Sequence, residues 1–200
     1  MSGVFLAAIV AHAVCGVSPM PAEMDELRRW VSVKFEGVQE SPPPAAGLIE
    51  VLANNDPVQA NARMGRPMRI ADVEYSRGLY CHAVSKILVH LPGPGKSLQS
   101  VVGVDSNEQT SGGRGSVVFS VTVNGVQVWQ SPLVQEGMRA VPLTVPLNGA
   151  TQLFLEVGDG GDGISCDQAD WADAKVILED GGEVWLGDLP IRDAGRTPYT

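Results

Sequence analysis

The chain has 200 residues, with 14 Lys and Arg against 23 Asp and Glu, which leaves a formal net charge of −9. This length is enough for one domain with its own core plus tails. The acidic balance, with no basic patch, argues against nucleic acid and membrane surfaces as partners and leaves neutral ligands and cations open. The 23 Gly and 14 Pro, with only 6% aromatic residues, favour an all-β domain with many turns.

The N-terminal segment predicts export. Residues 1–13 carry no charged side chain and end in Ala11-His12-Ala13, which fits the small-x-small pattern of a signal-peptidase site. We therefore expect a signal peptide over 1–13 and a secreted or periplasmic protein; a buried first strand is the alternative. Residues 14–46 are predicted to be a short N-terminal extension that closes with a proline-rich linker around Pro42–Pro44.

From residue 47 onward the pattern is typical of strands. The run from Val117 to Val123 is rich in β-branched residues, Asn124-Gly125 follows, and a second apolar run begins at Val126. Asn-Gly between two such runs is a strong hairpin signal, because both turn positions favour positive φ. Many short strands with no helical periods between them predict a β-sandwich over 47–187, with 188–200 as a tail or linker. The expected strands are 48–52, 86–91, 98–104, 117–123, 126–130, 139–145, 152–157, 174–178 and 183–186.

Residues 158–173 are the densest acidic run of the chain, with five aspartates and four glycines between the apolar runs 153–157 and 174–178. Carboxylates this close repel one another unless a cation or backbone donors absorb the charge, and Ca²⁺ takes about six to eight oxygens in a flexible geometry. We expect this segment to be a loop that holds a structural calcium ion. The alternative is turn chemistry, in which the Asp side chains cap backbone amides. The candidate metal ligands are Asp159, Asp162, Asp167 and Asp170.

The chain has three cysteines, Cys15, Cys81 and Cys166, which do not pair evenly and show no metal-binding spacing. In an oxidising compartment Cys81 and Cys166 could form a disulfide, which would close a long loop and restrict the unfolded chain. Two buried free thiols are the alternative.

Four sequence blocks follow one another along the chain: RGLYCHAVS at 77–85, VGVD at 102–105, GSVVFSV at 115–121 with Asn-Gly after it, and the acidic run 158–173. Together they resemble the NPCBM family of carbohydrate-binding modules, with Gln168 standing where histidine is usual. The resemblance implies a galactose-binding-like β-sandwich of the jelly-roll type, usually attached to secreted or periplasmic glycoside hydrolases, often α-galactosidase-like ones. It also implies sugar binding without chemistry, and a structural calcium ion.

The candidate ligand-binding residues fall in segments beside these blocks. His82 can donate one hydrogen bond and accept another, and the run 105–110 is dense in donors and acceptors, as sugar hydroxyls require. Trp171 can offer a ring face to a pyranose. The alternatives are a buried histidine, a solvated turn, and a core tryptophan that holds the acidic loop to the sheet. The predicted set is His82, Asp105, Asn107, Gln109, Gln168 and Trp171.

The sequence thus predicts a non-catalytic carbohydrate-binding module that targets a linked or partner glycoside hydrolase to a galactose-type or related neutral glycan. One alternative is a structural module that orients a neighbouring catalytic domain and has no sugar affinity. Another is a glycoside hydrolase with Asp105 and Asp170 as its carboxylate pair. The sequence contains no nucleophile elbow, HExxH, P-loop or Rossmann fingerprint, so we expect this chain not to be an enzyme.

Overall fold

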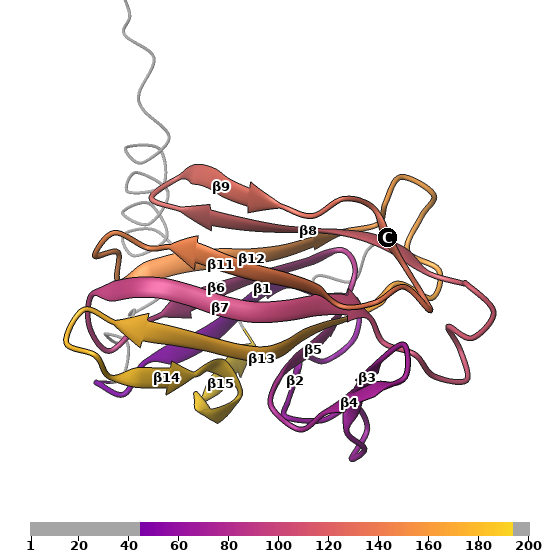
Figure 1. The fold of residues 1–200 in the computed structure, drawn as a ribbon, viewed down its shortest axis with the longest axis horizontal. Coiled ribbons are helices and arrows are strands. Elements are labelled where there is room, and N and C mark those ends of the chain that lie inside the picture. Colours follow the sequence, from indigo (N-terminus) through magenta and orange to yellow (C-terminus); the bar gives the residue numbers. More distant parts are fainter. Residues whose placement is uncertain (1–44, 194–200) are drawn as a thin grey trace, which may run out of the picture. The chain divides into compact units, whose positions relative to one another are not determined.

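The computed structural model describes residues 45–193, which form strands joined by turns (Figure 1). Residues 1–44 and 194–200 lie outside the described part, so the signal peptide, the proline-rich linker and most of the tail remain predictions. Within 45–193 the only helical turn is the 3-10 helix η2 at Leu186–Asp188, and no helix there is long and apolar enough to cross a membrane. The strands are β1 (Leu48–Ala53), β2 (Gln59–Ala60), β3 (Met68–Ile70), β4 (Val73–Tyr75), β5 (Gly78–His82), β6 (Ser85–His90), β7 (Gly95–Val104), β8 (Ser116–Val123), β9 (Val126–Gln130), β10 (Val134–Gln135), β11 (Val141–Pro146), β12 (Gln152–Gly158), β13 (Gln168–Leu178), β14 (Glu183–Trp185) and β15 (Ile191–Asp193).

Two sheets make up the sandwich. The seven-stranded sheet has the order β10-β8-β12-β6-β1-β15, with β9 also paired to β8. The six-stranded sheet has the order β11-β7-β13-β5-β2, with β14 also paired to β13. A separate hairpin consists of β3 and β4. The all-β sandwich that the sequence predicts is therefore confirmed, and β1 with β15 is the one parallel pair among the described strands.

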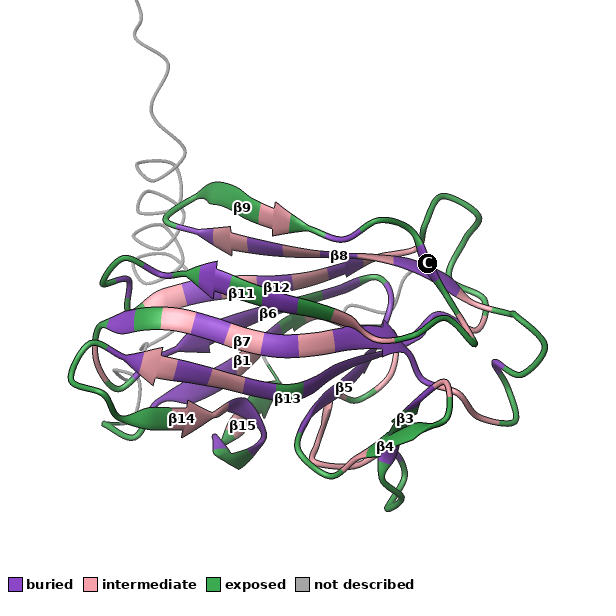
Figure 2. Ribbon diagram, viewed as in Figure 1, coloured by how far each residue is buried: buried purple, intermediate pink, exposed green. Residues whose placement is uncertain are grey.

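The core lies between the inner faces of the sheets. In β8 the side chains of Val117, Phe119, Val121 and Val123 are buried, whereas the residues between them are partly exposed. β12 shows the same alternation, which Figure 2 displays as alternating colours along both strands. Successive side chains of a strand point to opposite faces, so this pattern buries one face of the sheet against its partner.

All nine predicted strands are present, with ends that move by a few residues. The prediction of one continuous loop over 158–173 is wrong in its second half, because β13 begins at Gln168. Five successive residues from Gln168 to Ala172 are buried, since β13 lies in the middle of its sheet and is covered on both faces. Strand burial on two faces removes the alternation by which a strand is recognised in sequence.

β13 brings three of the four family-like blocks side by side. Its residues Gln168 and Trp171 pair with His82 and Leu79 of β5, and on its other side Trp171 pairs with Val102 of β7. Gly78 at the start of β5 has φ of +132°, and a Cβ built there would lie 2.1 Å from the carbonyl oxygen of Trp171. Only glycine fits at this position, which explains one residue of the RGLYCHAVS block in physical terms.

Candidate functional site

Loops at one end of the sandwich surround two hollows. The first, of about 540 Å³, lies among the segment before β3, the β3–β4 hairpin and the loop that follows β7. The second, of about 520 Å³, lies among the ends of β5 and β13 and the same loop after β7. The side chain of Glu108 lines both hollows, so they meet at that loop.

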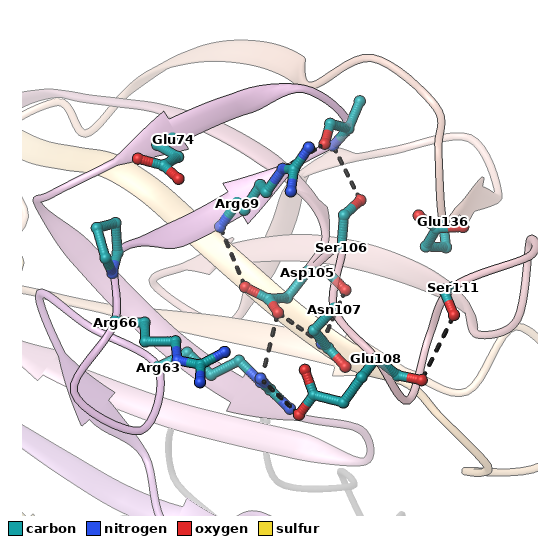
Figure 3. Close-up of a pocket in the computed structure, with 12 residues that line it drawn as sticks. Arg63, Arg66, Arg69, Glu74, Asp105, Ser106, Asn107, Glu108, Ser111 and Glu136 are labelled. Atoms are coloured by element: carbon teal, nitrogen blue, oxygen red, sulfur yellow. Dashed lines mark hydrogen bonds and ion pairs between the residues drawn. The ribbon is translucent and has the colours of Figure 1, made fainter.

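Charged side chains of both signs line the first hollow (Figure 3). The buried Arg63 forms ion pairs through Nε with Asp105 at 3.4 Å and through Nη1 with Glu108 at 3.6 Å. The guanidiniums of Arg66 and Arg69 add two positive charges, and the carboxylates of Glu74 and Glu136 balance them. The hollow therefore presents donors and acceptors together, with three arginines against four carboxylates.

Asp105 is the buried anchor of this wall, with 2% of its surface exposed. Its Oδ2 accepts the backbone N–H of Arg69 at 3.1 Å, and its Oδ1 accepts Asn107 Nδ2 at 2.6 Å. The Thr110 hydroxyl donates to the backbone carbonyl of Asp105 at 2.6 Å. These bonds hold the loop after β7 in one conformation and link it to the β3–β4 hairpin.

Asp170 lies beneath Asp105 and is fully buried, and neither of its carboxyl oxygens has a hydrogen-bond donor in the described residues. Burial raises the pKa of Asp170 well above its usual range, the nearby charge of Asp105 raises it further, and Arg63 opposes both effects. A protonated Asp170 can donate to Asp105, so the two carboxyls share one negative charge, which Arg63 compensates.

Asp170→Asn is expected to raise the free energy of unfolding at neutral pH. The folded-state pKa of Asp170 is raised, so the folded chain holds a proton that the unfolded chain releases. Stability is therefore lost as pH rises above the ordinary pKa of 3.8, by at most about 1.4 kcal/mol per pH unit. Asparagine has the same shape as a protonated aspartate and keeps a hydrogen-bond donor, but it does not titrate, so the variant does not lose stability as the pH rises. Urea unfolding between pH 4 and 8 tests the prediction, which is contradicted if the variant keeps the wild-type slope.

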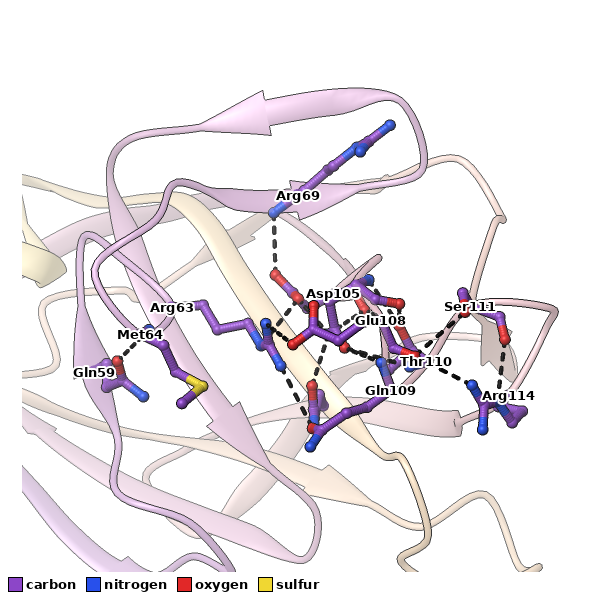
Figure 4. Close-up of polar contacts among 12 residues, drawn as sticks. Gln59, Arg63, Met64, Arg69, Asp105, Glu108, Gln109, Thr110, Ser111 and Arg114 are labelled. Atoms are coloured by element: carbon purple, nitrogen blue, oxygen red, sulfur yellow. Dashed lines mark hydrogen bonds and ion pairs between the residues drawn. The ribbon is translucent and has the colours of Figure 1, made fainter.

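Amide side chains and one histidine line the second hollow. Gln168 Oε1 accepts Asn107 Nδ2 at 2.7 Å, and Gln168 Nε2 donates to Gln109 Oε1. Arg63 Nη2 donates to the same Gln109 oxygen at 3.4 Å (Figure 4). His82 Nδ1 lies 2.8 Å from the carbonyl oxygen of Ala83. A carbonyl only accepts, so Nδ1 carries the hydrogen in this contact.

Five of the six predicted ligand residues come together here. Asp105 and Asn107 line the first hollow, and His82, Gln109 and Gln168 line the second. Sequence reasoning missed Arg63, whose guanidinium contacts both Asp105 and Gln109. The available signal was three arginines within seven residues, at 63, 66 and 69, in a chain with only 14 Lys and Arg.

Trp171 is not at the site, and its prediction as a sugar platform is wrong. Its surface is 0% exposed, and its ring meets Phe119 edge to face with centroids 5.1 Å apart and planes at 90°. A ring enclosed by the core has no face to offer a ligand, so the alternative of a core tryptophan holds. Sequence could not decide this, because Trp171 lies in the part of β13 that belongs to the acidic run, and that run resembles a loop in sequence.

The four predicted metal ligands do not form one set. Asp162 Oδ1 accepts the Ser116 hydroxyl at 2.9 Å, Asp167 Oδ1 accepts the Ser116 backbone N–H at 2.8 Å, and Asp159 Oδ1 accepts Gly161 N–H at 3.1 Å. Asp170 instead lies next to Asp105. Within residues 45–193 no group of three or more His, Cys, Asp or Glu is placed to hold a metal ion. Asp159, Asp162 and Asp167 each accept a hydrogen bond from a nearby loop or strand residue, and calcium binding stays a prediction.

Burial raises the pKa values of Asp167 and Cys81. Burial raises the pKa of Asp167 to about 6, and the Ser116 backbone N–H opposes that shift. Cys81 and Cys166 are free thiols, and burial raises the pKa of Cys81 to about 12, which makes it a poor nucleophile. Of the two alternatives for this pair, the structure has the thiols and not the disulfide, although Cys166 is only half-buried.

Comparison with known proteins identifies the class to which this β-sandwich belongs. The profile of the NPCBM/NEW2 domain matches residues 45–177, so the chain belongs to that family and is a carbohydrate-binding module. A solved structure with the same fold is the CBM51 module of Clostridium perfringens GH95 in complex with methyl-galactose. It is 28% identical, covers 63% of this chain and 91% of its own, and superposes with a TM-score of 0.58.

Two curated relatives are glycosidases by name. One, from Renibacterium salmoninarum, carries the provisional name endo-alpha-N-acetylgalactosaminidase and is 33% identical over 125 residues, 62% of this chain. The other, alpha-1,3-galactosidase B of Akkermansia muciniphila, is 26% identical over 170 residues, 82% of this chain. The chain spans only 8% and 20% of the lengths of these relatives. The resemblance seen in the four sequence blocks is thereby confirmed.

Proposed function

We propose that the two hollows around the loop after β7 bind a neutral glycan of galactose type. The observation that carries the proposal is the side-chain chemistry at the junction, where Asn107, Gln109, Gln168 and Arg63 form one hydrogen-bonded network. Each sugar hydroxyl both donates and accepts, and amides together with Arg and carboxylate groups supply both partners. The methyl-galactose complex of the CBM51 relative supports galactose as the first ligand to test.

Binding at this site would depend on hydrogen bonds more than on ring stacking. Of the described residues that line the two hollows, none is Trp, Tyr or Phe. Shallow polar sites gain little over competing water, so we expect dissociation constants on the order of micromolar to millimolar. Tethering to a hydrolase would compensate for weak single-site affinity by raising its local concentration at the polysaccharide.

The role in the whole protein is also proposed. The glycosidase names of the relatives support a linked or partner glycoside hydrolase and a secreted or periplasmic location. A non-catalytic role is favoured because Asp170, one of the two carboxylates considered for hydrolysis, is fully buried beside the other, Asp105. Hydrolases that retain configuration need two carboxyls about 5–5.5 Å apart and in reach of substrate, and a carboxyl as fully buried as that of Asp170 is not in reach.

Calorimetric titration of the 200-residue chain with methyl-galactoside, N-acetylglucosamine, glucans and mannans tests the proposal, with calcium and with a chelator. Gln109→Ala removes an exposed amide at the junction and is expected to weaken binding by about tenfold or more. Gln127→Ala, an exposed amide on β9 that lines neither hollow, is the matched control and should leave affinity unchanged. Binding of no glycan would favour the structural-module alternative, and equal effects of both variants would place the site elsewhere.

The calcium arm of the titration separates two cases. If calcium changes neither melting temperature nor affinity, the aspartates of the acidic run act only as caps. If calcium raises the melting temperature and Asp162 is one of its ligands, the Asp162→Asn substitution will abolish the rise. A rise that survives this substitution would mean that other oxygens bind the ion.

A further inference from the structure

β9 is a free edge of the seven-stranded sheet. Its five residues, Val126–Gln130, pair with β8, and no other strand of residues 45–193 pairs with β9. Within this part of the chain, the backbone N–H and C=O groups on its outer side therefore have no strand partner, which is the condition for pairing with another chain. In Figure 1 this strand lies at the margin of the sandwich, beyond β8.

The other edges of the sandwich carry features that discourage pairing. β11 contains Pro142 and Pro146, β15 contains Arg192, and β2 has only two residues. Prolines, charges and short length are the usual ways of protecting an edge strand. β9 contains neither proline nor a charged residue. The one feature of β9 that discourages pairing is a β-bulge, where Val128 has no partner in β8.

Exposed apolar side chains occur on β9 and in the segment that follows it in sequence. Val126 is 62% exposed, Val128 44% and Leu133 46%, and Met138 follows at 42%. Four of the nine exposed large hydrophobic residues of 45–193 thus lie within thirteen consecutive positions. Figure 2 shows β9 mostly in green, the colour of exposed residues. A strip of this kind marks a contact surface more often than scattered single residues do.

The charge pattern points to a second copy of the chain as the occupant. No Asp, Glu, Lys or Arg occurs from Gly115 to Gln135, a run of 21 residues in a chain of net charge −9. Two such acidic molecules repel one another over most approaches, and repulsion is least where both surfaces are uncharged. A two-fold axis across β9 would also place the same apolar residues against themselves, which is what an isologous interface requires.

We propose that β9 and the segment after it form a self-association interface between two copies of this chain. The inference goes beyond glycan binding and does not depend on it. If the glycan site is as proposed, a dimer would in addition carry two sites and gain avidity for a repetitive polysaccharide.

Sedimentation equilibrium of the full 200-residue chain over a range of concentrations tests the inference. We expect the wild-type mass to rise from one chain towards two, and Val126→Lys and Val128→Lys each to weaken association by about tenfold or more, because like charges would meet across the axis. Val73→Lys is the matched control, since Val73 is a similarly exposed valine (48%) on β4 and lies outside the edge. Thermal unfolding of each variant establishes that it is folded.

Three results would overturn the inference. A wild-type chain that stays monomeric at every concentration would show that β9 does not pair with a second copy, and a strand of a different protein would be the next partner to test. A dimer that both lysine variants form as readily as wild type would place the interface elsewhere. An equal loss with Val73→Lys would show a general effect of added charge and not a contact at β9.

Discussion

Trp171→Ala is expected to lower the free energy of unfolding by about 3–5 kcal/mol, the usual range for truncating a buried aromatic side chain. The ring is fully buried, meets Phe119 edge to face, and lies on the central strand β13 between β7 and β5. The lost contacts include both the transfer of a large apolar surface and the edge-to-face pair. Urea unfolding followed by circular dichroism measures the loss. A parallel variant, Trp185→Ala, removes a half-buried ring at the sheet margin and should cost less.

Sugar binding separates this structural role from a direct one. Trp171→Phe keeps an apolar ring in the core and is expected to retain both most of the stability and the wild-type affinity for methyl-galactoside. If Trp171→Phe stays folded but loses binding, the tryptophan must reach the ligand, and its burial in this structure would not describe the bound state.

Arg63→Ala is expected to destabilise the domain by about 3–5 kcal/mol, because it strands buried carboxyls without their counter-ion. Arg63 and Asp105 are 6% and 2% exposed, their ion pair spans 3.4 Å, and Asp170 lies beneath them. The same substitution removes the donor to Gln109, so glycan binding should fall as well. Chemical unfolding at neutral pH measures the loss. It should shrink as the pH is lowered into the acidic range, since protonation removes the stranded charge.

Arg66→Ala is the control for this prediction. Arg66 lines the same hollow but is exposed, so its removal should change stability by no more than about 0.5 kcal/mol. A large loss from Arg66→Ala, or a negligible one from Arg63→Ala, would contradict the view that Arg63 is the compensating charge of the buried wall.

Much of the fold could be predicted because its signals are local. The alternation in 117–123 and the Asn-Gly after it yield β8, its turn and β9 without reference to any other part of the chain. Arg77–Ser85 and the acidic run carry the family likeness in their own letters, so membership and the all-β sandwich follow from sequence. Several short strands, among them β3, β4 and β15, were missed because three residues hold too little pattern.

The site was predicted in part, for a related reason. His82, Asn107, Gln109 and Gln168 were found because polar side chains with both donors and acceptors stand out beside the family blocks. Arg63 was missed because its significance comes from a carboxylate 42 positions later. The aspartates of 158–173 were grouped by their closeness in sequence, yet Asp170 lies on β13 and faces Asp105, away from the loop that holds Asp159 and Asp162.

The sequence by itself determined the class of the domain, its strand pattern and the polar residues from which a site could be built, since periodicity, turn chemistry and family blocks are all properties of neighbouring residues. Only the tertiary structure decided which of those residues are enclosed and which meet. Burial and pairing depend on strands distant in the chain, here β5, β7 and β13, whose packing turns Trp171 inward and sets Arg63 against Asp105.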